Sequence, residues 1–254
     1  GISELHAEIY ERWVQLSGGP DAEVPKWLLE GTPMGIKANA VDVGVFPPVD
    51  DQCPSELRRE LEFYHERFVN YAPLEDSPHG KEVLDKLIEG GCVKKFSSLA
   101  KAKRFLGQAM PVTSKLALIT TDNDGVVKRR LILDCRVSGS NDAAYRLERI
   151  LLPKAWDIVN GIMELQKRVV DDEVVELMVL DFADAFYMLP LRGNERSFFT
   201  AHYKGEFYIW LRIAQGSING PTAIGRLSAL AARMTQGLYQ PGRLQLQICM
   251  DDPC

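Results

Sequence analysis

Hydrophobic and polar residues alternate along several short stretches of this chain, which is the pattern of strands with one buried face. Residues 115–121 and 130–136 follow this pattern on either side of Asn123-Asp124-Gly125, a sequence that favours a tight hairpin turn. Residues 197–203 and 206–211 form a second pair around a Lys-Gly turn. The alternation therefore predicts two β-hairpins.

Two further strand-like runs end in carboxylates. Residues 174–180 are mostly apolar and lead into Asp181, and residues 244–250 alternate and lead into Asp251 and Asp252. Successive side chains of a strand point to opposite faces, so adjacent aspartates share one site only where the strand bends into a turn. If the two strands are neighbours, three carboxylates converge, as a site for hard cations requires.

Helical periodicity and helix-end signals mark five other segments. One helix begins at a serine cap after Pro54, another stops at Gly90-Gly91, and the last begins at Pro221. The rest of the first fifty residues is rich in glycine and proline and predicts an irregular lead-in. The predicted helices cover residues 3–16, 55–68, 80–89, 154–169 and 221–239. Helices placed between hairpin-type strand pairs favour an α+β fold over a doubly wound sheet.

Length and composition narrow the class of protein. The chain has 254 residues, of which 46% are hydrophobic, enough for one large core or two smaller ones. Its five cysteines are scattered without the spacing of a zinc site, which predicts a reduced, intracellular protein, cytoplasmic or nuclear. We expect no membrane association and no signal peptide, because no apolar run approaches the 18 or more residues of a span.

Charge is distributed unevenly along the chain. The net charge is −5, yet residues 91–170 hold 15 basic against 7 acidic residues, a net of +8. A localised positive patch of this kind favours phosphate binding, although an ordinary solvated surface is the alternative interpretation. The basic residues of this stretch include Lys94, Lys95, Lys101, Lys103, Arg104, Lys128, Arg129 and Arg130.

Four segments, in this order along the chain, carry a recognisable combination of residues. Residues 128–136 place basic and apolar residues before Asp-Cys-Arg, and residues 179–191 place two aspartates and an aromatic residue before Pro-Leu. Residues 213–222 contain a Gln-Gly turn that leads into a helix started by proline, and residues 249–252 read Cys-Met-Asp-Asp. Together they resemble the fingers and palm of reverse transcriptases from retroviruses and long-terminal-repeat retrotransposons, over roughly residues 80–254.

The resemblance implies the fingers and a partial palm of a right-hand polymerase, with the thumb absent. It divides the chain into an N-terminal extension (1–80, partly helical), fingers (81–150), the palm with the first motif (151–191), a hairpin with the Gln-Gly turn (192–220) and an incomplete palm (221–254). The implied activity is RNA-directed DNA polymerisation. The implied partners are an RNA or DNA template with its primer and dNTPs, and the oligomeric state stays open.

The resemblance also implies roles for individual residues. Asp181, Asp251 and Asp252, with the backbone carbonyl of Phe182, would hold two Mg²⁺ ions, with Mn²⁺ as a possible substitute. The residues expected to bind dNTP are Lys128, Arg130, Asp184, Ala185, Phe186, Gln215 and Gly216. The residues expected to contact nucleic acid are Lys94, Lys95, Lys101, Lys103, Arg104 and Met250.

Two departures from the family pattern leave alternatives open. Cys249 stands where the family has a tyrosine, and the chain stops directly after Asp251-Asp252. The first alternative is therefore an inactive, truncated retroelement remnant that binds nucleic acid weakly. A palm polymerase that makes RNA is a second alternative, against which the bulky Phe186 argues. A small-molecule metalloenzyme is a distant third, because no histidine lies near the three carboxylates.

Overall fold

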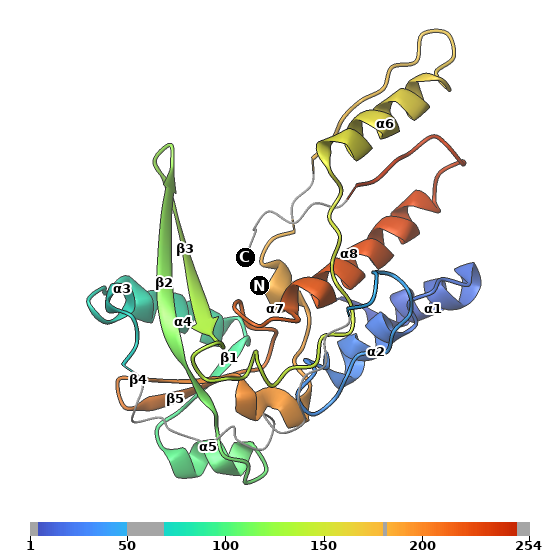
Figure 1. The fold of residues 1–254 in the computed structure, drawn as a ribbon. Coiled ribbons are helices and arrows are strands. Elements are labelled where there is room, and N and C mark those ends of the chain that lie inside the picture. Colours follow the sequence, from blue (N-terminus) through green and yellow to red (C-terminus); the bar gives the residue numbers. More distant parts are fainter. Residues whose placement is uncertain (1–4, 50–68, 180–181, 248–254) are drawn as a thin grey trace.

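The protein is a mixed α+β structure whose centre is one five-stranded sheet (Figure 1). The computed structural model describes residues 5–49, 69–179 and 182–247. The strands lie in the order β1-β5-β4-β2-β3. Their bounds are β1 Val93–Phe96, β2 Thr113–Asn123, β3 Val126–Asp134, β4 Thr200–Tyr203 and β5 Glu206–Trp210. The α+β class expected from the sequence is confirmed.

The first predicted hairpin is confirmed as β2 and β3. The two strands pair antiparallel from Lys115 opposite Asp134 to Asn123 opposite Val126. Their turn is Asp124-Gly125, both with positive φ (53° and 85°), the backbone conformation that tight hairpin turns require. The alternating pattern of β3 gives the strand one buried and one partly exposed face. Leu131 and Leu133 are buried, while the residues next to them are partly exposed. The hairpin rises well clear of the rest of the fold (Figure 1).

The second predicted hairpin is confirmed as β4 and β5, with a shorter first strand. Residues Gly193–Phe198 form a 3₁₀ helix, η2, so β4 begins only at Thr200. Strand β1, which the sequence did not predict, pairs with β5, and β4 pairs with β2 in parallel over two residues. The sheet is therefore mixed, although most of its pairs are antiparallel.

Four predicted helices are present. They are α1 (Ala7–Ser17), α4 (His79–Glu89), α6 (Ala155–Gln166) and α8 (Gly220–Gln236), while the helix predicted over 55–68 lies outside the described residues. The sequence missed four shorter helices, namely α2 (Glu23–Glu30), α3 (Ala72–Glu75), α5 (Leu99–Phe105) and α7 (Ala185–Met188). Short helices give too few turns for a hydrophobic periodicity to be seen.

The predictions of strands at 174–180 and 244–250 are wrong for the residues that are described. Residues 174–179 and 244–247 have no ladder partner, and Val174 and Val179 are 76% and 94% exposed. An apolar run becomes a strand only when a neighbour accepts its backbone hydrogen bonds. Residues 244–247 keep the predicted alternation, because Leu244 and Leu246 are half-buried between exposed glutamines. The side-chain pattern is present there without the strand.

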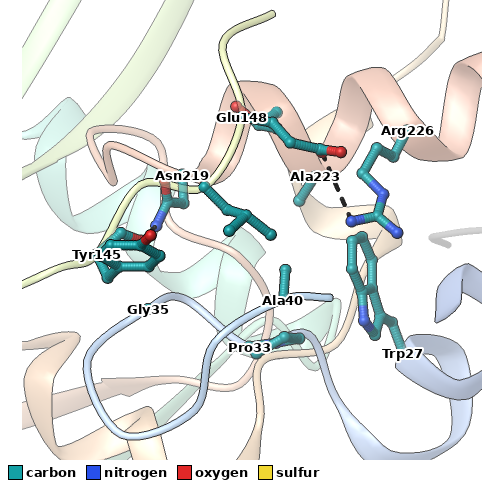
Figure 2. Close-up of a pocket in the computed structure, with 11 residues that line it drawn as sticks. Trp27, Pro33, Gly35, Ala40, Tyr145, Glu148, Asn219, Ala223 and Arg226 are labelled. Carbon is teal, nitrogen blue, oxygen red and sulfur yellow. Dashed lines mark hydrogen bonds and ion pairs between the residues drawn. The ribbon is translucent and has the colours of Figure 1, made fainter. Parts of the chain in front are cut away.

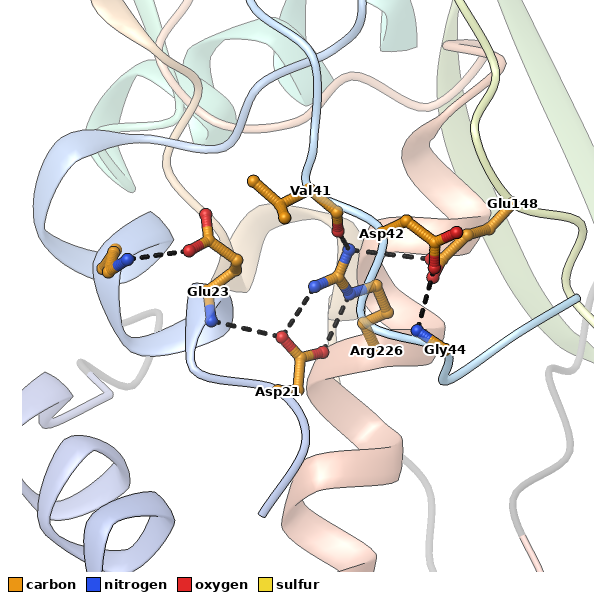
Figure 3. Close-up of polar contacts among 8 residues, drawn as sticks. Asp21, Glu23, Val41, Asp42, Gly44, Glu148 and Arg226 are labelled. Atoms are coloured by element: carbon orange, nitrogen blue, oxygen red, sulfur yellow. Dashed lines mark hydrogen bonds and ion pairs between the residues drawn. The ribbon is translucent and has the colours of Figure 1, made fainter. Parts of the chain in front are cut away.

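The N-terminal region is fixed to the rest of the molecule by buried charges (Figure 3). Arg226 of α8 donates two hydrogen bonds to Asp21 (2.8 and 2.7 Å) and one to the carbonyl of Val41 (2.9 Å). Glu195 of η2 accepts from four backbone N–H groups of residues 34–38. Residues 21–42 are therefore part of the same core as the sheet and α8. The domain boundaries implied by the resemblance stay predictions.

No helix in the described ranges is both long and apolar enough to span a membrane.

Candidate nucleotide-binding surface

The Gln215-Gly216 turn is held against the end of β3. The backbone N–H of Leu133 donates to the carbonyl of Gln215 (2.8 Å). Asn141 fixes the turn from the other side, because its Nδ2 donates to the carbonyl of Gly216 (3.0 Å) and its Oδ1 accepts from the N–H of Ile218 (2.9 Å). The turn therefore has a defined position relative to the hairpin.

Glycine is required at position 216 for two reasons. Its φ is +110°, and a Cβ built on it would overlap the carbonyl oxygen of Leu133. Only glycine adopts such a φ without steric cost, and only glycine lets the two backbones approach this closely. A Cβ at this position would also lie 3.2 Å from Cγ2 of Ile132. The turn thus faces the side of β3 that carries Ile132.

That face of β3 carries the two basic residues expected to bind the triphosphate. Side chains two residues apart on a strand share a face, so Lys128 and Arg130 lie on the same side as Ile132. Arg130 is half-buried and pairs across the hairpin with Ile119, whereas Lys128 is exposed and nearer the turn. Arg130 is therefore the closer of the two to Gly216.

Phe186 reaches the same region from α7. Asp184 precedes this helix with a positive φ of 53°, and its carbonyl accepts from the N–H of Tyr187 (2.8 Å). Phe186 is half-buried, and a Cβ built on Gly220 would lie 2.8 Å from its Cε1. The ring therefore packs against the first residue of α8. Burial raises the pKa of the neighbouring Tyr187, which stays a neutral phenol.

Three segments far apart in the sequence thus meet at one place, namely the end of β3, the Gln215-Gly216 turn and the start of α7. Ala185 and Phe186 pack against the main core, while Asp184 is exposed. Phe182, expected to contribute a carbonyl, is 42% exposed. The remaining candidates, Asp181, Met250, Asp251 and Asp252, lie outside the described residues. Among the residues that are described, no three His, Cys, Asp or Glu side chains form a group able to hold a metal ion.

The basic residues at 94–104 form a separate group on β1 and α5. Phe96 and Phe105 pack with ring centroids 5.1 Å apart, and Lys94 lies over the Phe105 ring at 4.6 Å. Lys95 is paired with Glu206 at 3.2 Å. Helix α5 lies at the opposite end of β2 from the hairpin turn (Figure 1). The basic stretch of the sequence is therefore divided between two places on the molecule. Lys101, Lys103 and Arg104 belong to the α5 group.

The segments that lead toward the candidate carboxylates lie side by side. Arg243 forms an ion pair with Glu173 at 2.6 Å, and a Cβ built on Gly242 would overlap the Arg168 side chain. A Cβ built on Gly161 of α6 would lie 3.2 Å from Cδ of Gln245. The chain thus brings residues 161–173 beside residues 242–245.

Comparisons with known proteins gave structural matches alone. No model of a known protein family and no curated protein matches the sequence. One solved structure similar to this chain is a foamy viral protease-reverse transcriptase, designated dRH, in complex with double-stranded DNA. It is 15% identical with a TM-score of 0.45, and the match covers 89% of this chain and 35% of that one. A second, the foamy viral protease-reverse transcriptase with double-stranded DNA, is 16% identical with a TM-score of 0.41.

The match to the second structure covers 94% of this chain and 44% of that one. The chain therefore spans less than half of the length of either structure. TM-scores of this size do not establish a shared fold.

Sequence patterns gave no sign of Asn141, although it fixes the Gln-Gly turn. Its partners, Gly216 and Ile218, lie 75 and 77 residues away. The structural role of Arg226 could have been anticipated from the sequence, because it is a charged residue among the small and apolar residues of α8. A charged residue on such a helix predicts a buried partner of opposite charge.

Replacement of Gly216 by alanine is expected to destabilise the turn. The positive φ alone costs roughly 1–2 kcal/mol for a residue with a Cβ, and the overlap with Leu133 adds about 1–3 kcal/mol. Gly205→Ala is the matched control, because Gly205 has a φ of +79° with nothing within 4 Å of a Cβ. Urea unfolding of both variants measures the difference. Equal losses of stability would contradict the close packing of the turn on β3.

Proposed function

We propose that this chain is the fingers and part of the palm of an RNA-directed DNA polymerase, a reverse transcriptase. The observation that carries the proposal is the meeting of β3, the Gln215-Gly216 turn and α7 at one place. These three segments hold the residues that the motif resemblance assigns to dNTP. They are fixed to one another by the Leu133–Gln215 hydrogen bond and the contact of Phe186 with Gly220.

The chemistry of the candidate residues agrees with this function. Arg130 offers a planar fork of N–H donors, which suits the oxygens of a triphosphate, and Lys128 adds a second positive charge. A bulky Phe186 beside the nucleotide sugar would favour deoxynucleotides over ribonucleotides. Asp184, Ala185, Gln215 and Gly216 would complete the nucleotide site.

Asp181, Asp251 and Asp252 would hold the metal ions, because carboxylates are hard ligands that suit Mg²⁺. Bound metal would stabilise the charge that develops on the attacking and leaving oxygens of nucleotidyl transfer. The ion pair between Glu173 and Arg243 brings together the two segments that lead to these carboxylates. Asp181 follows Glu173 by eight residues, and Asp251 follows Arg243 by the same number.

The second candidate function is nucleic-acid binding without catalysis. The basic group on β1 and α5 favours it, because Lys94 lies over two half-buried aromatic rings, Phe96 at 5.9 Å and Phe105 at 4.6 Å. Basic side chains that neutralise phosphates would bind nucleic acid regardless of its sequence, with a strong dependence on salt.

Primer extension on an RNA template tests the proposal. Any extension is expected to require Mg²⁺ and dNTPs and to fall on the order of 100-fold or more in Asp181→Asn, because metal supplies several kcal/mol of charge stabilisation. Asp172→Asn is the matched control, since Asp172 belongs to an Asp-Asp pair outside the motifs. Salt-dependent binding of the template–primer without extension would favour the second function instead. Preferred incorporation of ribonucleotides would indicate a polymerase that makes RNA.

A further inference from the structure

A pocket lies beside the N-terminal half of α8 (Figure 2). Its walls come from α2, the loop of residues 33–40, residues 145–148 and the first two turns of α8. The lining side chains that matter here are Trp27, Ala40, Tyr145, Glu148, Asn219 and Thr222. The residues of this pocket are not among those assigned to nucleotide, metal or nucleic acid.

Glu148 is the unusual group in this pocket. It is 4% exposed, and its Oε2 lies 3.6 Å from Nη1 of Arg226. The backbone N–H of Val43 donates to the Glu148 carboxylate, yet its oxygen Oε1 is buried without a hydrogen-bond partner in the part of the chain that the structure describes. A buried acceptor that has lost water and gained no donor is costly, so such an atom usually marks a position that a donor occupies.

Arg226 does not satisfy that oxygen. Its Nε and Nη2 donate to Asp21, and its Nη1 donates to the carbonyl of Val41 (Figure 3). Its guanidinium lies 4.4 Å from the centre of the Trp27 ring (Figure 2). The charged groups that act on Glu148 are Arg226, Asp42 and Asp21. Of the two charged residues that line the pocket, Arg226 is thus engaged mainly with Asp21, and among the described residues the carboxylate of Glu148 has one ion-pair contact, at 3.6 Å. A second guanidinium, that of Arg233, acts on Asp21.

The other polar groups of the wall also favour a donor as ligand. Asn219 uses its Nδ2 on the carbonyls of Met34 and Tyr145, both at 2.9 Å. With Nδ2 used in this way, Asn219 can offer a ligand only its Oδ1, which is a hydrogen-bond acceptor. The Thr222 hydroxyl can also accept a hydrogen bond. The aromatic residues Trp27 and Tyr145 complete a wall of the kind that cations prefer.

We propose that this pocket binds an alkylammonium group, with Glu148 as the main acceptor. The source is a small free amine or the side chain of a lysine in a peptide, since both present the same three N–H donors and one positive charge. A neutral donor would satisfy the hydrogen bond of Oε1 without adding a counter-charge to the carboxylate, and an anion would be repelled by it.

Titration of the 254-residue chain with methylammonium, followed by the amide NMR signals of Gly35 and Ala40, tests the site. We expect saturable shifts that Glu148→Gln weakens at least tenfold. Ala40→Leu should block binding by filling the pocket without changing its charge, and Asp42→Asn is the electrostatic control, with at most a threefold loss. Thermal unfolding of each variant verifies that it is folded.

Two further ligands separate the possible explanations. Tetramethylammonium carries the charge without N–H donors and should bind at least tenfold more weakly than methylammonium. Titration with Nα-acetyl-lysine amide separates the sources, because tighter binding than methylammonium indicates a peptide side chain and weaker binding indicates a free amine. Equal binding of methylammonium by the parent chain and Glu148→Gln, or no saturable shift in the parent chain, would overturn the proposal.

The proposal also predicts a dependence on pH. Burial raises the pKa of Glu148, Arg226 opposes this shift, and Asp42 and Asp21 reinforce it. Methylammonium requires the carboxylate, so its affinity should fall as the pH is lowered through this raised pKa. The stability of the ligand-free chain should change in the opposite direction. Its free energy of unfolding should fall as the pH rises above the unfolded pKa of Glu148, because the folded state holds the proton more tightly. The difference between the parent chain and Glu148→Gln from pH 5 to 8 isolates this contribution.

Discussion

Arg226→Met is expected to lower the free energy of unfolding by about 3–5 kcal/mol, because it leaves buried carboxylates without their counter-charge. The Arg226 side chain is 1% exposed, and Asp21, its bidentate partner, is fully buried. Methionine fills similar space but donates no hydrogen bond to Asp21 or to the carbonyl of Val41. Urea unfolding measures the loss.

The size of this effect can be separated from the effect of lost packing. The double variant Asp21→Leu/Arg226→Met removes both charges, and we expect it to recover at least half of the stability lost by Arg226→Met. Arg192→Met is the surface control, because the Arg192–Glu30 pair is partly exposed and should be worth less than about 1 kcal/mol. A double variant no more stable than Arg226→Met would indicate that packing, and not the buried charge, dominates.

Glu195→Ala is expected to cost at least about 3 kcal/mol, because it leaves four backbone N–H groups without an acceptor at about 1–3 kcal/mol each. Glu195 is fully buried, and its Oε1 accepts from Ile36 (2.8 Å), Lys37 (2.7 Å) and Ala38 (3.1 Å). Its Oε2 accepts from Met34. The carboxylate thus holds the whole loop in place.

Glu195→Gln separates the shape of this side chain from its charge. Glutamine can keep one oxygen toward residues 36–38 while its NH₂ group opposes the N–H of Met34, so an intermediate loss of stability is expected. Hydrogen exchange of the Ile36 and Lys37 amides should accelerate more in Glu195→Ala than in Glu195→Gln. Glu206→Ala, which removes a surface partner of Lys95, provides the control. Unchanged protection of both amides in Glu195→Ala would show that Glu195 is not their main acceptor.

Local sequence signals were sufficient to predict the helices and strands whose formation depends on residues close in the sequence. The Asn-Asp-Gly turn sets the hairpin of β2 and β3, and Pro221 marks the first turn of α8. The strand expected at 174–179 depends instead on a partner strand, and an apolar run carries no information about whether that partner lies beside it. Residues 244–247 show the same limit, since they keep their alternation without forming a ladder.

The functional residues also fall into two groups, those that a local sequence pattern could identify and those that only long-range contacts reveal. Gly216 could be identified from the sequence, because a Gln-Gly turn before a proline-started helix is a local feature. Asn141, Glu148 and Glu195 could not, because their roles depend on contacts with residues 75 or more positions away. Lys128 and Arg130 could be named as candidates for binding the triphosphate, but their position relative to Gly216 became clear only from the contact of the Gln215 turn with β3.

The bond between Asp21 and Arg226 spans 205 positions of the chain. At a synthesis rate of about 5–20 residues per second, the ribosome needs roughly 10–40 s to supply Arg226 after Asp21 has emerged. During that interval Asp21 lacks its guanidinium partner, and residues 34–38 lack the carboxylate of Glu195 for most of the same time. The segment around Asp21 therefore completes its buried contacts only after Arg226, 205 positions later, has been synthesised.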